Sequence, residues 1–585
     1  MSLHPLANLF AVSHADPVII RELAAQMRSH GDFTEVWRPA DSWVVGLAPL
    51  PCSEPDGAVV RDLGFAFVEG KDLVEGAAKG DSLPFFRQVA KWAWESPEKL
   101  VALPGDFGFV RFRPAGEATL VRSCGGLVPF YYGFLQGRVV MGTRLAYFVR
   151  YLPEEVPVDP LTNVIWSACH LAFPNNRSFL AGISILKSGR FARIERGKRI
   201  EIGRYWHPRS KVLPSFTPSR TQEHAERLRA LLIGKLERDL DPGGGNLLTL
   251  SGGVDSSAIA AVACGIVGRK LSTWSMVPDQ EDICQVELSY IQPLASRFAF
   301  ERSWFFRLNH RSRLAGLRDG PNTVFQVLHP ALCALPQLVR EAPIRVLVGG
   351  EYADMVGGAH GRVPDWLAHN SLFRLLSVMG LQPLGPRVLL SWAKRFLTSL
   401  ARTPTVPYQN CLPDFVRPEL AEEYRAWFEM QRSEAGRDQD PLRFLQLSTE
   451  ADEWVIQNWE AASAVGVRRS LPFYNREMIE LAFDCHPAEL IGPGTKKLLR
   501  LALADDVPAR NLHRTDKGCW GGYLLSPVRL TWDADFTSLM SPVVMENWWP
   551  RPSKIVDYHQ AIHLTALKKF EDLYRAWRLR RGETV

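Results

Sequence analysis

The first 210 residues alternate short apolar runs with turn residues, a pattern typical of β-strands with tight connections. Two longer stretches, Pro17–Ser29 and Leu83–Trp94, have the character of helices. Many strands with few helices between them predict an α+β domain of stacked antiparallel sheets. The expected strands are Ser42–Leu47, Leu63–Val68, Phe107–Arg113, Thr119–Arg122, Phe130–Phe134 and Arg138–Gly142.

The pattern changes after residues 211–219, KVLPSFTPS, whose two prolines and three hydroxyl residues predict a linker. A helix is expected at Thr221–Asp239, and buried strands then alternate with helical stretches. This alternation predicts an α/β domain with a parallel sheet covered by helices on both faces. From about residue 360 onward we expect a large helical part. The expected strands are Asn246–Leu250, Lys270–Val277, Ala299–Phe306 and Ile344–Val348.

Composition narrows the class of protein. A chain of 585 residues is long enough for two or more domains, and its 23% charged and 46% hydrophobic residues are ordinary for a soluble protein. The net charge of +6 permits an anionic ligand, but we find no nucleic-acid signature. Nine scattered cysteines without a CxxC pair favour reduced thiols in a cytoplasmic protein. We find no signal peptide and expect no membrane span.

The most informative stretch is Leu248–Ser257, LTLSGGVDSS, which joins a predicted strand to the predicted helix Ala258–Val267. A strand–loop–helix turn of small residues directs backbone N–H groups and the positive helix end at one point, which suits a phosphate. Asp255 adds a carboxylate there, which suggests a bridging Mg²⁺. The lysine of a Walker A loop is missing. The alternative is a Ser/Gly-rich turn in an ordinary α/β unit.

A second acidic residue follows another strand. The predicted strand Ile344–Val348 ends in GGEYAD, so Asp354, like Asp255, lies just beyond a strand end. Ligands of parallel sheets bind at the carboxyl ends of the strands. We therefore expect the two aspartates to meet and to hold Mg²⁺ together.

The SGGVDS stretch resembles the SGGxDS loop of the N-type ATP pyrophosphatases, which cleave ATP to AMP and pyrophosphate. This resemblance implies adenylation chemistry with ATP and Mg²⁺. Further segments resemble the asparagine synthetase B type in the same order along nearly the whole chain, including GEYAD against GEGAD and TKKLLR against TKYILR. They are residues 103–109, 121–132, 142–148, 179–193, 204–206, 350–354, 466–473 and 495–500.

Departures from the family pattern carry functional information. Glutamine-dependent members use a cysteine that follows the initiator methionine, whereas this chain has Ser2, and its first cysteine is Cys52. The resemblance therefore implies an inactive, degenerate Ntn-hydrolase-like glutaminase domain at 1–210, the linker at 211–219 and an ATP-pyrophosphatase synthetase domain at 220–585. Arg468, Ser470 and Asn475 replace a glutamate, an arginine and an aspartate of the family, which disfavours free aspartate as a substrate.

Family members without a glutaminase include β-lactam synthetases and lasso-peptide macrolactam synthetases (lasso cyclases). Both activate a carboxylate, and an amine of the same molecule then attacks it. The length and the helical region at about 360–460 look more like a lasso cyclase. Tryptophans in this region are expected either to line a peptide cleft or to form a packing layer, and both readings stay open. They are Trp366, Trp392, Trp427, Trp454 and Trp459.

This resemblance implies a linear core peptide as substrate, with a leader peptidase and a leader-binding protein as further partners. One alternative is a β-lactam-synthetase-like or other small-molecule amide synthetase, which would share every ATP-binding residue. A second alternative, from another class, is a catalytically inactive peptide-binding scaffold. Retention of Asp255, Asp354 and Lys496 argues against this scaffold.

The resemblance also assigns roles to single residues. Lys496 matches a family lysine expected to stabilise negative charge in the reaction. Lys497 is the fallback, because neighbouring helical residues point about 100° apart and one alone should reach the site. Glu351 is expected to orient or deprotonate the attacking amine, or to be a helix N-terminal charge. The expected ATP-binding residues are Leu250, Ser251, Gly252, Gly253, Asp255, Ser256, Ser257, Ser275, Met276, Gly349, Gly350 and Lys517.

Overall fold

The structure is a computed structural model. It describes most residues of the two regions that contain β-sheets. The described residues are 6–14, 16–29, 33, 35–49, 59–60, 65–68, 82–135, 138–152, 159, 162, 176–195, 199–208, 217–278, 281–308, 330–358, 418–435, 453–490 and 496–514.

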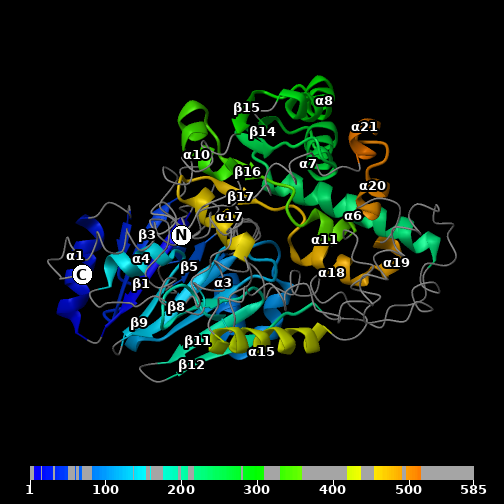
Figure 1. Cartoon of the computed structure of the whole chain (residues 1–585). Helices are drawn as coiled ribbons and strands as arrows, with labels where there is room; N and C mark the ends of the chain where they lie inside the picture. The colour runs from blue at the N-terminus through cyan, green and yellow to red at the C-terminus, as the bar shows by residue number, and fades with distance from the viewer. Residues whose placement is uncertain are drawn as a thin grey trace.

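Two six-stranded antiparallel sheets form the N-terminal region (Figure 1). The first has the strand order β10-β8-β9-β1-β3-β2 and the second β12-β11-β7-β6-β5-β4. The first sheet contains β1 (Leu6–Ser13), β2 (Glu35–Trp37), β3 (Trp43–Pro49), β8 (Phe130–Leu135), β9 (Arg138–Gly142) and β10 (Ile183–Leu186). The second contains β4 (Val59–Val60), β5 (Phe65–Val68), β6 (Gly108–Phe112), β7 (Ala118–Arg122), β11 (Arg190–Glu195) and β12 (Arg199–Arg204).

Aromatic side chains pack the two sheets face to face. The Trp43 ring of β3 lies 5.1 Å from the Phe112 ring of β6, and its Nε1 donates to the Arg113 carbonyl at 3.0 Å. On the opposite face of the first sheet, Phe10 packs 5.3 Å from Phe148 of α4 (Leu145–Tyr151). The predicted antiparallel sheets are therefore confirmed.

Two further helices accompany these sheets. Helix α1 (Pro17–Ser29) packs against β3 of the first sheet, and α3 (Ser82–Glu95) packs against β7 of the second. Helix α1 buries Ile20, Leu23, Ala24 and Met27, the spacing of an amphipathic helix.

The C-terminal region is built on a five-stranded parallel sheet with the order β15-β14-β13-β16-β17. Its strands are β13 (Asn246–Thr249), β14 (Leu271–Pro278), β15 (Ser303–Leu308), β16 (Val346–Val348) and β17 (Arg468–Ser470). One face packs against α10 (Pro330–Glu341) and α17 (Glu453–Ser463), and the other against α6 (Pro218–Asp239), α7 (Val254–Ala260) and α8 (Glu281–Phe298). The prediction of helices on both faces is confirmed.

Several boundaries differ from the predictions. Helix α6 begins at Pro218, within the predicted linker, and a π-helix at Ala261–Ile266 continues α7. Strand β15 begins at Ser303 rather than at Ala299, because α8 extends to Phe298 and Ala299 then takes a left-handed φ of 46°.

Helices dominate the described part of the chain beyond residue 352, as predicted. They are α11 (Ala353–Gly357), α15 (Pro418–Ala435), α17, α18 (Arg476–Asp484), α19 (Pro487–Leu490), α20 (Lys497–Ala502) and α21 (Ala509–Leu512). Among the described helices, none combines the length and apolar character needed to cross a bilayer.

The tryptophans of the predicted cleft are partly accounted for. Trp427 and Trp459 are 4% and 0% exposed, so these two belong to the packing layer rather than to an open cleft. Trp366, Trp392 and the Trp454 side chain lie outside the described residues.

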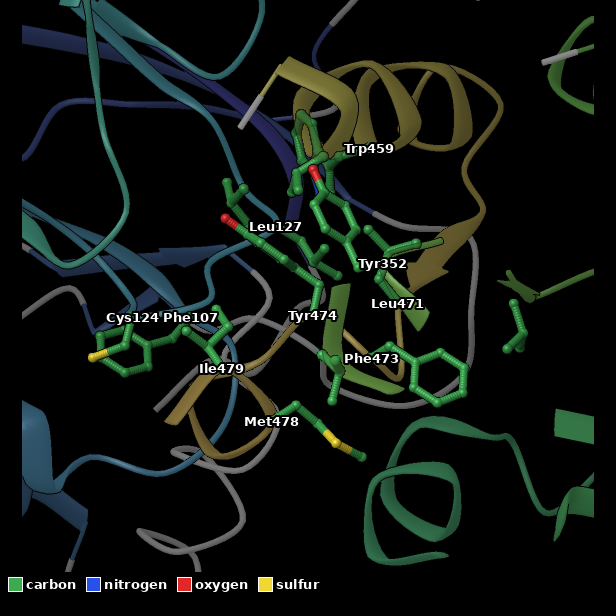
Figure 2. Packing of buried hydrophobic residues seen from close by; sticks show 14 of the residues in the cluster. Phe107, Cys124, Leu127, Tyr352, Trp459, Leu471, Phe473, Tyr474, Met478 and Ile479 are labelled. Atoms are coloured by element: carbon green, nitrogen blue, oxygen red, sulfur yellow. The ribbon is translucent and has the colours of Figure 1, made fainter. Parts of the chain in front are cut away.

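One continuous hydrophobic core joins the N-terminal sheets to the C-terminal region. Leu127, from the loop that precedes β8, shares a cluster with Trp459 of α17 and Tyr474 (Figure 2). Specific contacts accompany the apolar packing: the Tyr131 hydroxyl on β8 donates to Glu460 Oε1 at 3.2 Å. Gly125 lies so close to the N-terminal end of α18 that an added Cβ would be 2.6 Å from the Asn475 Cα.

This contact predicts the effect of two matched substitutions. Gly125→Ala forces a methyl group against the backbone of Asn475 and should lower the free energy of unfolding by about 1–3 kcal/mol. Gly234→Ala, inside α6 with no heavy atom within 4 Å of the added Cβ, should raise it by about 0.5–1 kcal/mol. Urea unfolding of both variants measures the difference. A Gly125→Ala protein as stable as the wild type would contradict the close packing.

Glu460 makes stability depend on pH. Burial raises the pKa of Glu460 to about 7 from 4.5, although Arg144 and the Tyr131 hydroxyl lower it. The folded protein therefore binds this proton more tightly than the unfolded chain, and the free energy of unfolding should fall as pH rises through this window. The shift corresponds to about 3 kcal/mol. Glu460→Gln should lack this decrease, which unfolding at a series of pH values measures, and parallel pH profiles would refute the assignment.

Candidate functional site

The parallel sheet reverses its direction of growth between β13 and β16. From β13 the chain adds β14 and β15 on one side and then returns to add β16 on the other. The loops that follow β13 and β16 therefore leave the same sheet edge as neighbours, which is the usual ligand position in such sheets. They are in contact, because a Cβ on Gly350 would lie 2.8 Å from the Asp255 Cβ.

The loop after β13 has the predicted strand–loop–helix form. Leu250 is buried, and its N–H still donates to the Trp274 carbonyl at 2.8 Å, so its side chain belongs to the core. Gly252 takes a φ of 67° and lies against Tyr290, where an added Cβ would be 2.7 Å from the Tyr290 Cβ. Gly253 is the N-cap of α7, and Ser251 is exposed.

The two serines at the start of α7 are buried rather than turned toward solvent. Ser256 is 4% exposed; its Oγ accepts from the Ser251 N–H at 3.2 Å and donates to the Gly253 carbonyl at 3.3 Å. Ser257 is fully buried. We conclude that the Ser256 hydroxyl shapes the loop, and that phosphate contacts by Ser256 and Ser257 stay a prediction.

Lys496 is the lysine that reaches the site. Its ammonium donates to Asp255 Oδ2, and its backbone takes a left-handed φ of 64° at the N-cap of α20. Such a conformation is uncommon for a residue with a side chain and is typical of functional sites. Lys497 is instead influenced by Glu489, which partly offsets the burial that lowers the pKa of this lysine.

The aspartate pair suits a divalent cation. Burial raises the pKa of Asp255, Lys496 lowers it, and the nearby Asp354 raises it further. Asp255 Oδ1 is buried and has no hydrogen-bond partner among the described residues. Two carboxylates with an oxygen left over are the hard oxygen ligands that Mg²⁺ prefers.

Glu351 is held by a buried cation that the sequence analysis did not identify. Arg469 Nη2 donates to Glu351 Oε1, and the Arg469 side chain is 1% exposed. The neighbouring residues face elsewhere: Arg468 donates to the Asp239 carbonyl and Ser470 to the Asp239 carboxylate, both on α6. Of the three exchanged residues noted in the sequence, Arg468 and Ser470 therefore contact α6, whereas Asn475 caps the N-terminal end of α18.

Two further residues that were not predicted hold the phosphate loop through its backbone carbonyls. Asn511 Nδ2 donates to the carbonyls of Gly252 at 3.0 Å and Tyr290 at 2.8 Å. Arg514 donates to the Ser251 carbonyl at 3.2 Å and to Glu287 Oε1 at 2.8 Å. Nothing short of the folded structure indicates these roles, because the residues lie more than 250 positions from the loop that they hold.

The expected adenine-binding residues Ser275 and Met276 lie side by side on β14. Ser275 and Met276 are consecutive residues of β14, so their side chains point to opposite faces of the sheet. Ser275 is 1% exposed, while Met276 packs against the apolar cluster of Leu247 and Trp274. Adenine binding at the edge of β14, near Ser275 and Met276, stays a prediction. Lys517 lies outside the described residues.

The comparison with protein families agrees with an ATP-dependent amide ligase. Residues 237–521 match the asparagine synthase family, a range that contains the phosphate loop, Glu351, Asp354 and Lys496. This match supports an asparagine synthetase-like family and indicates an ATP-dependent, AMP-forming amide ligase. No curated protein matches the chain.

Three solved structures share some similarity with the chain. The first is glutamine phosphoribosylpyrophosphate amidotransferase from B. subtilis complexed with ADP and GMP. The identity is 11%, the match covers 53% of this chain and 70% of that chain, and the TM-score is 0.21. An allosteric regulatory enzyme of purine biosynthesis has 10% identity, 60% and 77% coverage and a TM-score of 0.19. For the U34-tRNA thiolase NcsA from Methanococcus maripaludis, the identity is 12%, the match covers 42% of this chain and 84% of that chain, and the TM-score is 0.19. Scores this low carry no argument about fold or function.

The Arg514–Glu287 pair predicts a large stability effect. Both side chains are 3% exposed, so Arg514→Met leaves a buried carboxylate without its cation and should lower the free energy of unfolding by about 3–5 kcal/mol. The double variant Arg514→Met/Glu287→Met should recover part of this loss. The exposed Arg510, whose guanidinium lies 5.1 Å from the same Tyr290 ring, provides the control Arg510→Met. Equal losses for the two single arginine variants in urea unfolding would contradict the buried pair.

Proposed function

We propose that this chain is an ATP-dependent macrolactam synthetase that joins an Asp or Glu side-chain carboxylate of a peptide to the N-terminal amine of the same peptide. The observation that carries the proposal is the convergence at one sheet edge of the phosphate loop, Asp255, Lys496 and the loop that holds Glu351 and Asp354. The family match covers all of these residues.

The first step is adenylation. The Ser251–Gly253 loop and the N-terminal end of α7 bind the ATP phosphates. Asp255 and Asp354 would hold Mg²⁺, which, when bound, neutralises charge on the phosphates. The peptide carboxylate attacks the α-phosphorus, the bond to the β-phosphate oxygen breaks, and an acyl-adenylate and pyrophosphate result.

The second step forms the amide. The N-terminal amine attacks the acyl carbon, the bond to AMP breaks, and the amine loses one proton. Lys496 is placed to stabilise negative charge that develops on the carbonyl oxygen and the phosphate. The Glu351 carboxylate accepts a hydrogen bond from the amine and so orients it. The peptide product is lighter by one water, and each ring closure yields one AMP and one pyrophosphate.

The N-terminal region, residues 1–210, has no part in this chemistry and is proposed to be an inactive glutaminase-like domain. Burial raises the pKa of the Cys124 thiol to about 12, which makes it a poor nucleophile. The synthetase domain, 220–585, would therefore work without ammonia from glutamine, after the linker proposed at 211–219.

The peptide substrate distinguishes this proposal from its alternatives. A β-lactam-synthetase-like or other small-molecule amide synthetase would use the same ATP-binding residues, whereas a peptide-binding scaffold would consume no ATP. A leader peptidase and a leader-binding protein are proposed as partners, because a core peptide with a free N-terminal amine must first be released from a precursor.

The test uses synthetic linear peptides, each with a free N-terminal amine and a single Asp or Glu, incubated with the protein, ATP and Mg²⁺. Mass spectrometry should detect a product lighter by one water, together with an equal amount of AMP. Asp255→Ala should abolish both products, and Lys496→Met should slow their formation by about 100- to 1000-fold. The control Lys270→Met, whose side chain is 73% exposed, should match the wild type.

Other outcomes separate the alternatives. AMP release without loss of water from any peptide would favour another acceptor. Absence of both products, with leader peptidase and leader-binding protein supplied, would overturn the proposed function and favour the scaffold.

A further inference from the structure

A guanidinium group is buried beside the site, between Glu351 and α17. The Arg469 side chain is 1% exposed, and burial lowers its pKa, although Glu351 raises it. Its donors have three acceptors on three different segments. Nη2 donates to Glu351 Oε1, Nε to Asn458 Oδ1 at 3.1 Å, and Nη1 to the Leu347 carbonyl of β16 at 3.1 Å.

These contacts leave the two oxygens of Glu351 in different states. Oε1 is fixed by Arg469, whereas Oε2 is buried and has no hydrogen-bond partner among the described residues. Gly349 permits the arrangement, because a Cβ at this position would overlap Glu351 Oε2 and Arg469 Nη2. Oε1 is thus anchored, whereas Oε2 retains an acceptor site that no described residue fills.

Helix α17 connects this cation to the N-terminal sheets. Asn458, which accepts from Arg469, is 1% exposed, and the adjacent Trp459 is fully buried in the core shared by both regions. The next residue, Glu460, accepts from the Tyr131 hydroxyl of β8. The position of Arg469 therefore depends on packing between α17 and a region that we propose to be catalytically inactive.

We propose that Arg469 is a positioning residue for amide formation: it fixes Glu351 so that Oε2 meets the attacking amine, and the N-terminal sheets hold Arg469 in place through α17. This inference rests on the proposed function. Lysine is no substitute, because an ammonium lacks the planar fork of donors that matches three fixed acceptors.

The two reaction steps provide the test, because Arg469 is assigned to the second step alone. Hydroxylamine converts any acyl-adenylate to a hydroxamate without help from Glu351, so hydroxamate formation from the same synthetic peptides reports adenylation. In Arg469→Lys, hydroxamate formation should stay within about twofold of the wild type, while kcat for lactam formation should fall by about 100-fold, the effect of misplacing a reacting group by about 1 Å. The KM for ATP should not change.

The chain offers a matched control in the next residue. Arg468→Lys makes the same substitution in a side chain that donates to the Asp239 carbonyl on α6. Both steps should proceed at the wild-type rate in this variant. Asn458→Ala keeps the guanidinium and removes one of its acceptors, so it should lower lactam formation less than Arg469→Lys. If Arg469→Lys does not fold, Asn458→Ala decides the question by the same split between the two steps.

Outcomes against the inference are distinct from outcomes against the proposed function. Equal losses of hydroxamate and lactam, or no loss of either, would overturn the positioning role. If the wild-type protein forms no AMP with any peptide, the proposed function fails. Crystal structures of wild type and Arg469→Lys then decide the remaining claim without substrate: a Glu351 carboxylate displaced by about 1 Å or more supports positioning by Arg469, and an unmoved carboxylate overturns it.

Discussion

Parallel pairing of β13 with β16 is the constraint on which the site depends. The two strands run side by side in register, so the loops that follow them leave the sheet at the same edge. Gly350 then brings its loop to within van der Waals contact of Asp255, where any larger residue would force the loops apart. The carboxylates, the glycine loop and Lys496 converge because this pairing fixes the starting point of both loops.

Buried charges around the site are each held by several contacts. Arg514 and Asn511 support the phosphate loop through its carbonyl oxygens, and Arg469 holds Glu351. Burying a charged side chain costs free energy that its hydrogen bonds only partly return. We therefore take these buried arginines as groups that fix a geometry rather than as groups that add stability. Arg469 and Arg514, each bound to more than one acceptor, fix the positions of Glu351 and of the phosphate loop.

The N-terminal sheets support the C-terminal region. They share one hydrophobic core with the C-terminal region, and their loop at Gly125 packs against the backbone of Asn475. A region with no proposed part in the chemistry can still be indispensable if it holds α17 in position. The glutaminase inactivity that we propose is therefore compatible with a structural role for this region.

The sequence by itself determined the local elements and the chemistry of the central loop. Helix α1 and strand β9 begin and end where the pattern predicts, because apolar spacing and turn residues act over a few positions. The family resemblance implied a role for Lys496 in the reaction, but the contact of its ammonium with Asp255, 241 residues away, comes from the structure alone. Strands β1 and β17 were not predicted: β1 is buried on both faces and lacks alternation, and β17 consists of two arginines and a serine.

The tertiary structure decides which of two adjacent, chemically similar side chains points into the site. Adjacent positions such as Lys496 and Lys497, or Arg468 and Arg469, carry the same chemistry, and neither spacing nor periodicity separates them; the family resemblance alone favours Lys496 over Lys497. Backbone direction separates them: the left-handed conformation of Lys496 points its ammonium at Asp255, and the alternation of β17 turns Arg469 toward Glu351 and Arg468 toward α6. Side-chain direction follows from packing across the whole sheet, which is why it could not be read from local sequence.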